Sequence, residues 1–210
     1  MAHESASAQN SPNAPEGSGS MKKIIHLGVV LFTVTAITGL ILGAVNDITA
    51  EPIRRTQARL KAEALAAALP EAEAFSAVDL SSKGGSAIIR DVQAGSAGGK
   101  TVGHCITVAP SGYAGAIEIV VGINESGGLR AIRILSQSET PGLGAKAPLP
   151  EFSGQFAGKD AERLVVVKSK PSAPDQIQAI SGATITSDAV TSGVNSALEY
   201  WRDNLKSQGR

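Results

Sequence analysis

The chain has 210 residues, with 19 basic and 19 acidic side chains and a formal net charge of zero at pH 7. This length allows one modest domain with additional segments, and the balanced charge lacks the basic excess of nucleic-acid-binding proteins. The single cysteine excludes an internal disulfide, and neither it nor the three histidines have the spacing of a metal or haem site. We therefore expect neither a nucleic-acid partner nor a bound metal.

The N-terminal part predicts a membrane anchor. Residues 1–20 are mostly Ser, Ala, Gly, Pro and Asn, a composition that predicts disorder. Residues 21–46 begin with Met21 and two lysines and then carry no charge for about twenty residues, the length of a transmembrane helix. A cleaved signal peptide is the alternative, but its apolar region is shorter, about 7–15 residues. The two lysines predict a cytoplasmic N-terminus, with the rest of the chain outside.

Residues 47–70 predict a helical stalk that continues from the anchor or packs on the domain. Pro52 lies where the first turn of a helix tolerates proline, and Pro70 is a stop signal. Ala and Leu recur on one face, and Arg and Lys on the other.

Residues 71–210 predict one α+β domain with a largely antiparallel sheet and a C-terminal helix. Apolar alternation predicts strands within residues 87–92, 103–110, 114–124, 129–137 and 162–170. The turn at residues 125–128 predicts a hairpin in which Gly127 and Gly128 adopt positive φ. From Ser187 onward, apolar residues at helical spacing predict a core-facing stripe: Val190, Val194, Leu198, Trp201 and Leu205.

Two stretches are candidates for binding chemistry. The first, "SETPGLGAK" at residues 138–146, predicts an ordered turn whose glycines allow a flat ligand close to the backbone. In this interpretation Leu143 lies on an aromatic face and Thr140 bonds its edge. The alternative is an ordinary connection after a strand.

The second stretch, "ISGATITSDAV" at residues 180–190, opens the last helix. A helix N-terminus offers free N–H groups and a positive dipole end, which stabilise a phosphate. Ser181 or Ser187 could cap the helix, but two more hydroxyls, on Thr184 and Thr186, exceed that need. A structural, serine-rich helix entrance is the alternative.

The two stretches together resemble a known family. "SGAT" at residues 181–184 resembles the flavinylation motif of the FMN-binding domain family, and "ETPGLGAK" at residues 139–146 resembles its companion loop. With "APSGYAGAIEIVVGIN" at 109–124 and "FSGQFAGK" at 152–159, the order and spacing are similar to the G subunits of Rnf-type ferredoxin:NAD⁺ oxidoreductases. The C subunit of the sodium-pumping NADH:quinone oxidoreductase shares both motifs, but "PSGYAG" and the short length favour the Rnf branch.

The resemblance implies a site for covalent FMN. A flavin transferase would join the FMN phosphate to the Thr184 hydroxyl as a phosphoester. Ser181, Gly182, Ala183 and the following N–H groups would hold the phosphate, and Thr186 or Ser187 would cap the helix. The companion loop would pack on the ring through five residues: Glu139, Thr140, Gly142, Leu143 and Gly144. Tyr113 is a further candidate ring neighbour, and a surface turn aromatic is its alternative.

The implied function is electron relay, without a catalytic acid or base of its own, rather than turnover of a free substrate. The implied partners are membrane subunits that carry iron–sulfur and flavin centres, in the inner membrane of a bacterium, with the domain on the periplasmic side. A non-redox, anchored scaffold module is the alternative of another class. A soluble hydrolase finds no support, because His104 and Cys105 are adjacent in a strand and face opposite sides.

Overall fold

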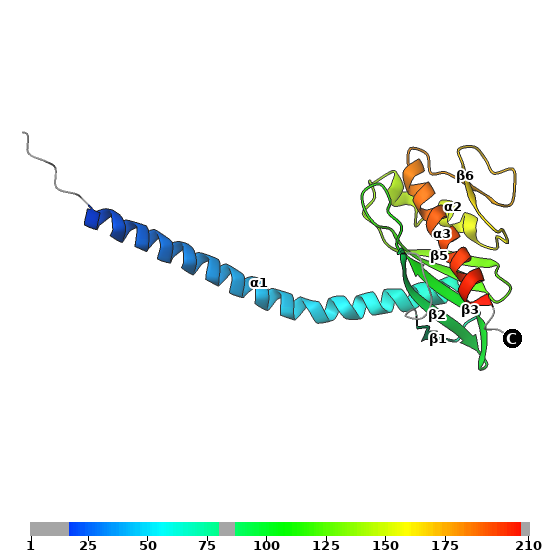
Figure 1. The fold of residues 1–210 in the computed structure, drawn as a ribbon, viewed down its shortest axis with the longest axis horizontal. Coiled ribbons are helices and arrows are strands. Elements are labelled where there is room, and N and C mark those ends of the chain that lie inside the picture. Colours follow the sequence, from blue (N-terminus) through cyan, green and yellow to red (C-terminus); the bar gives the residue numbers. More distant parts are fainter. Residues whose placement is uncertain (1–16, 80–86, 207–210) are drawn as a thin grey trace, which may run out of the picture. The chain divides into compact units, whose positions relative to one another are not determined.

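The computed structural model describes residues 17–79 and 87–206 (Figure 1). Its larger elements follow one another as α1 Gly17–Ala68, β1 Ala74–Ala77, β2 Ile89–Ala97, β3 Lys100–Val108, β4 Glu118–Asn124, β5 Leu129–Ser136, α2 Pro150–Ser153, β6 Val165–Val167, β7 Gln176–Gln178 and α3 Thr184–Asn204. The predicted α+β fold with an antiparallel sheet and a C-terminal helix is confirmed. Of the predicted disordered segment, residues 1–16 lie outside the described residues, and the backbone of residues 17–20 belongs to α1.

The chain divides into two compact units, Met1–Arg55 and Thr56–Arg210. In the first unit, α1 has a stretch long and apolar enough to cross a membrane, with its side chains exposed. The hydroxyls of Thr33, Thr35 and Thr38 donate to the carbonyls four residues earlier, at 2.8, 3.0 and 2.9 Å. These bonds satisfy the hydroxyls within the helix, as a lipid environment requires. The prediction that Pro52 lies in the first turn of a helix is wrong, because α1 runs unbroken from Gly17 to Ala68 with Pro52 inside it.

In the second unit, strands β1 to β5 form a sheet in sequence order, and every pair is antiparallel. Successive residues of β4 point to opposite faces. Ile119, Val121 and Ile123 join the core beneath α3, whereas Val120 joins a smaller cluster with the last turns of α1. The sheet is therefore covered on both faces.

The C-terminal end of α1 packs directly on the sheet. Leu65 and Ala68 are buried with Cys105 of β3, as the stalk prediction allowed. Gly122 of β4 lies so close to the Ala68 carbonyl that a Cβ at this position would overlap it. Lys61 adds an ion pair with Asp91 of β2, with 2.8 Å between Nζ and Oδ2.

The helix α3 covers the other face of the sheet (Figure 1). The predicted apolar stripe is confirmed, since all five of its residues are buried: Val190, Val194, Leu198, Trp201 and Leu205. Asn195 fixes the chain before β6 by exchanging two hydrogen bonds with the Leu164 backbone, at 2.8 and 2.9 Å.

Several local predictions need correction. α3 begins at Thr184, between the two starts that a Ser181 cap and a Ser187 cap would give. β1 and β7 had no prediction because each is very short. Positive φ is confirmed for Gly127, at 93°, but is wrong for Gly128. Gly128 instead donates its N–H to the Asn124 side chain at 2.8 Å, and this bond completes the turn.

Candidate functional site

A cleft of about 550 Å³ lies at the N-terminal end of α3. Its volume falls in the range of about 300–1,000 Å³ typical of small-molecule sites. The residues that line it come from three separate segments of the chain: Tyr113, then Glu139, Thr140, Leu143 and Gly144, then Gly182, Ala183, Thr184, Ile185 and Thr186. The two stretches singled out in the sequence thus meet at one site.

The loop after β5 forms a tight turn. The Leu143 N–H donates to the Thr140 carbonyl at 3.1 Å, and Gly142 has a φ of 79°. Proline followed by a residue with positive φ is the signature of a type II turn, which Pro141 and Gly142 supply. Because the turn is bonded internally, it holds Leu143 at the cleft, where the residue is 41% exposed.

A second turn leads into α3. The Ala183 N–H donates to the Ile180 carbonyl at 2.9 Å, and Gly182 has a φ of 76°. α3 then starts at Thr184 with Ala183 as its N-cap residue, and no side chain caps it. The first N–H groups of a helix have no partner within the helix, so here they remain available at the cleft.

The four hydroxyls of this stretch have different surroundings. Thr186 Oγ1 donates to Glu139 Oε2 at 2.5 Å. Ser187 Oγ donates to the Ala183 carbonyl and accepts from the Ile180 N–H, both at 2.9 Å. The predictions of a cap by Ser181, Thr186 or Ser187 are therefore wrong, because two of these hydroxyls are bonded elsewhere and the helix start is uncapped.

Thr184 differs from these hydroxyls. It is half-buried, it is the first residue of α3, and its side chain lines the cleft. In the described part of the chain its hydroxyl makes no side-chain hydrogen bond. A hydroxyl that is accessible and unbonded, next to free helix N–H groups, is suited to carrying a phosphate ester.

The two turns contact each other across the cleft. A Cβ added to Gly182 would lie 3.0 Å from Leu143 Cδ2, so the two motifs pack together through these residues. A third turn joins them, since Glu139 Oε1 accepts from the Ala114 N–H at 3.0 Å, next to Tyr113. The three turns that line the cleft are therefore connected to one another by direct contacts.

Most of the predicted site residues line the cleft, but two do not. Ser181 and Gly142 are exposed on the turns beside it. Ile185, which the sequence analysis did not single out, lines the cleft and is 56% exposed. The sequence signal that could have found it is its position between Thr184 and Thr186.

Comparison with known proteins identifies the family. The FMN-binding domain family matches residues 112–199, a range that contains every residue lining the cleft. The G subunit of the Na⁺-translocating ferredoxin:NAD⁺ oxidoreductase complex of Acetobacterium woodii is 38% identical over 197 residues, covering 88% of this chain and 95% of that protein. The chain belongs to the family of G subunits of ion-translocating oxidoreductase complexes.

Other members agree with this assignment. The G subunit of the proton-translocating ferredoxin:NAD⁺ oxidoreductase complex of Clostridium ljungdahlii is 38% identical, covering 78% of this chain and 83% of that protein. Among solved structures, NqrC of Shewanella oneidensis gives a TM-score of 0.47 at 21% identity, covering 56% of this chain and 61% of that chain. The assignment to the G-subunit family depends on the sequence relatives alone.

The residues of the cleft fit an FMN group. Its mouth carries three exposed apolar or aromatic side chains, on Tyr113, Leu143 and Ile185, which suit a flat ring. The uncapped start of α3 suits a phosphate. Among the described residues that line the cleft, Glu139 is the one charged side chain, so helix N–H groups rather than lysine or arginine would meet the phosphate.

Proposed function

We propose that this G-subunit family member is a membrane-anchored flavoprotein that relays electrons through FMN covalently bound to Thr184, within an ion-translocating ferredoxin:NAD⁺ oxidoreductase complex. The observation that carries the proposal is the unbonded Thr184 hydroxyl at the uncapped start of α3, inside a cleft of suitable size. The names of its relatives support the complex, and the FMN-binding domain match supports the cofactor.

The chain's own residues would position the cofactor rather than react with it. Thr184 would hold the phosphate as an ester, with the N–H groups of Ile185 and Thr186 directed at the phosphate oxygens. Leu143 and Tyr113 would shield the ring from water. The bound flavin supplies one- and two-electron transfer. Because attachment is through the phosphate, the ring stays chemically unmodified.

The anchor would keep the domain next to its redox partners. The apolar stretch of α1 supports insertion in a membrane, and Lys22 and Lys23 before it support a cytoplasmic N-terminus by the positive-inside rule. The domain would then lie on the periplasmic side of the inner membrane. Tethering raises the effective concentration of the partner subunits, which we propose carry iron–sulfur and flavin centres.

Mass spectrometry of the full chain tests this function. The protein is co-expressed with a flavin transferase, purified from membranes in detergent, and analysed intact and as peptides. We expect a mass increase of one FMN less one water on the peptide that contains Thr184. Thr184→Ala should lose it while keeping its thermal unfolding midpoint, and Thr186→Ser should retain it. An unmodified wild-type chain, or an adduct on another residue, would exclude the proposed attachment.

A further inference from the structure

Glu139 is a buried carboxylate in the wall of the cleft. Its residue is 5% exposed, and both carboxylate oxygens accept hydrogen bonds, one from the Ala114 N–H at 3.0 Å and one from Thr186 Oγ1 at 2.5 Å. Its own N–H donates to the Gln137 side chain at 2.6 Å. Each oxygen is thus held by a different segment of the chain.

Two glycines lie directly against the Glu139 carboxylate. A Cβ added to Gly112 would lie 2.5 Å from Oε1, and one added to Gly144 would lie 2.7 Å from Oε2. These two glycines come from different turns, on either side of the carboxylate. The close approach of both turns fixes the carboxylate in one place. It also explains why both positions are glycine, since a larger residue at either one would collide with the carboxylate.

The carboxylate has no cationic partner in the part of the chain that the structure describes. The ion pairs found there involve other residues, and the remaining cleft residues are uncharged. Burying a charge without a cation is costly, and such groups are kept where hydrogen bonds or function compensate the cost. Here the compensation comes from the two hydrogen bonds and the positive end of α3.

We infer that Glu139 is a positioning residue of the FMN site, which ties the Tyr113 turn to the first turn of α3 and places a negative charge at the wall of the cleft. This inference rests on the proposed function. It differs from the sequence expectation, in which Glu139 packs on the ring along with the rest of its loop.

The two hydrogen bonds of Glu139, which we call the tie, set the width of the cleft. Ala114 is adjacent to Tyr113, and Thr186 is one half-turn from Thr184, so the two hydrogen bonds of Glu139 fix the ring-shielding side against the attachment side. Leu143, from the same loop as Glu139, also lines the cleft. A displacement of the Tyr113 turn would therefore open the site to water without touching Thr184.

The negative charge of Glu139 would affect the midpoint potential of the bound flavin. A buried negative charge makes the arrival of another electron nearby less favourable, because Coulomb interactions are strong in a low-dielectric environment. Glu139 would thus lower the midpoint potential of the bound flavin. The uncharged, similarly shaped glutamine would keep both hydrogen bonds, since its oxygen can accept from Ala114 and its NH₂ can donate to Thr186.

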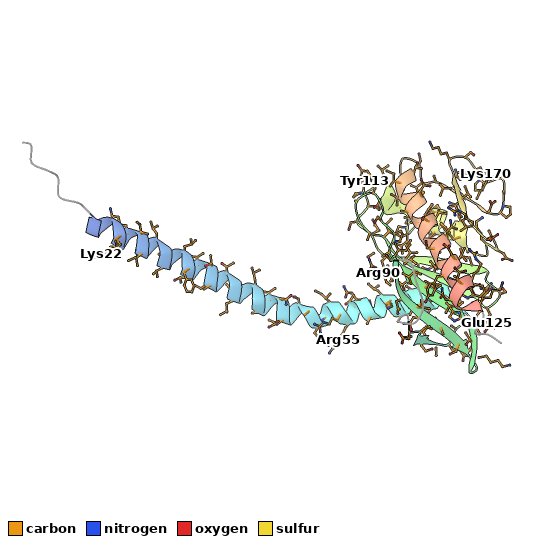
Figure 2. All side chains as sticks on the ribbon, viewed as in Figure 1. Lys22, Arg55, Arg90, Tyr113, Glu125 and Lys170 are labelled. Carbon is orange, nitrogen blue, oxygen red and sulfur yellow. The ribbon has the colours of Figure 1, made fainter. Side chains whose placement is uncertain are left out.

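The experiment separates the tie from the charge. Full-length wild type, Glu139→Gln, Glu139→Ala and Thr186→Val are each co-expressed with the flavin transferase and purified in detergent. Glu125→Gln is the matched control, because it removes the same charge from an exposed site at the other end of the domain from Tyr113 (Figure 2). Covalent FMN is quantified by mass spectrometry, and the midpoint potential by redox titration.

We expect Glu139→Gln to carry covalent FMN at the wild-type level with a more positive midpoint potential, and Glu125→Gln to match the wild type in both. Glu139→Ala and Thr186→Val should lose FMN severalfold, or hold it with greater quenching by soluble iodide. Should Glu139→Ala fail to fold, Thr186→Val still tests the tie.

The outcomes are distinguishable. An unchanged potential in Glu139→Gln overturns the role of the charge, and full FMN content with unchanged quenching in Thr186→Val overturns the tie. If the wild-type chain carries no FMN, the proposed function fails and this inference fails with it. If the wild type is loaded and the variants match it, the inference alone is wrong.

Discussion

Thr186 Oγ1 donates a hydrogen bond to Glu139 Oε2 at 2.5 Å across 47 positions of sequence. This bond joins the loop after β5 to the first turn of α3. It is possible because Gly144 has no side chain, since a Cβ there would lie 2.5 Å from Thr186 Oγ1. The glycine of the companion loop is thus needed for the contact between the two motifs.

Gly144→Ala should therefore damage the cleft. The added methyl group must push Thr186 and Glu139 apart, which we expect to cost about 1–3 kcal/mol of folding stability and to lower covalent FMN severalfold after co-expression with the flavin transferase. The measurements are thermal unfolding and intact mass. Gly154→Ala is the control, because a Cβ there meets nothing within 4 Å. Equal FMN content in both variants would contradict the prediction.

The sequence predicts which residues meet at the cleft better than it predicts their contacts. Thr184 and Leu143 line the cleft, and their motifs are local in the sequence. The bonds of Thr186 and Glu139 were not, since a hydroxyl in a first helical turn can bond its own helix or a distant residue, and only the folded chain decides between them. The capping predictions failed for this reason.

Gly122→Ala should destabilise the domain without affecting the cleft. Its Cβ would overlap the Ala68 carbonyl at the end of α1, where the helix packs on β4. We expect a loss of about 1–3 kcal/mol, or about 2–4 °C in the unfolding midpoint per kcal/mol for a domain of this size. Covalent FMN per folded molecule should stay at the wild-type level. An unchanged unfolding midpoint would show that α1 moves away from the sheet at little cost.

The fold was predictable where burial follows a period. The alternation in β4 and the stripe of α3 identify the two faces of the sheet. The short strands β1 and β7, of four and three residues, carry too few side chains for a period and depend on backbone pairing with neighbours. The start of α3 is set by the Gly182 turn rather than by a capping side chain, so neither a Ser181 cap nor a Ser187 cap predicts the boundary at Thr184.

Asp91→Asn should weaken the attachment of α1 to β2 in a pH-dependent way. Burial raises the pKa of Asp91, but hydrogen bonds from Lys61, Gln93 and the Val92 backbone, together with the Lys61 charge, lower it by more, so the pKa lies below its ordinary value. A lowered pKa stabilises the fold above the unfolded-state value of about 4 and loses this effect as the pH falls through the folded-state pKa.

We therefore expect Asp91→Asn to be less stable than wild type by about 0.2–1 kcal/mol at pH 7. The difference should begin to shrink near the unfolded-state pKa of about 4 and vanish once the pH is below the folded-state pKa. Denaturant unfolding at a series of pH values measures it. Lys61→Met combined with Asp91→Asn should cost little more than the single changes, because both remove the same pair. A difference that persists in acid would assign the effect to packing rather than charge.

Cys105 should be unreactive in the folded domain. Burial raises the pKa of its thiol to about 12, and Sγ lies 3.8 Å from the Leu65 carbonyl beneath the end of α1. The thiolate, which is the reactive form, is then scarce at pH 8. We expect iodoacetamide to leave the native chain unmodified and to add one group after unfolding in guanidinium chloride. Ser192→Cys, at an exposed position on α3, is the control and should add one group without unfolding. Stoichiometric alkylation of the native wild type would mean that α1 separates from β3 often enough to expose the thiol.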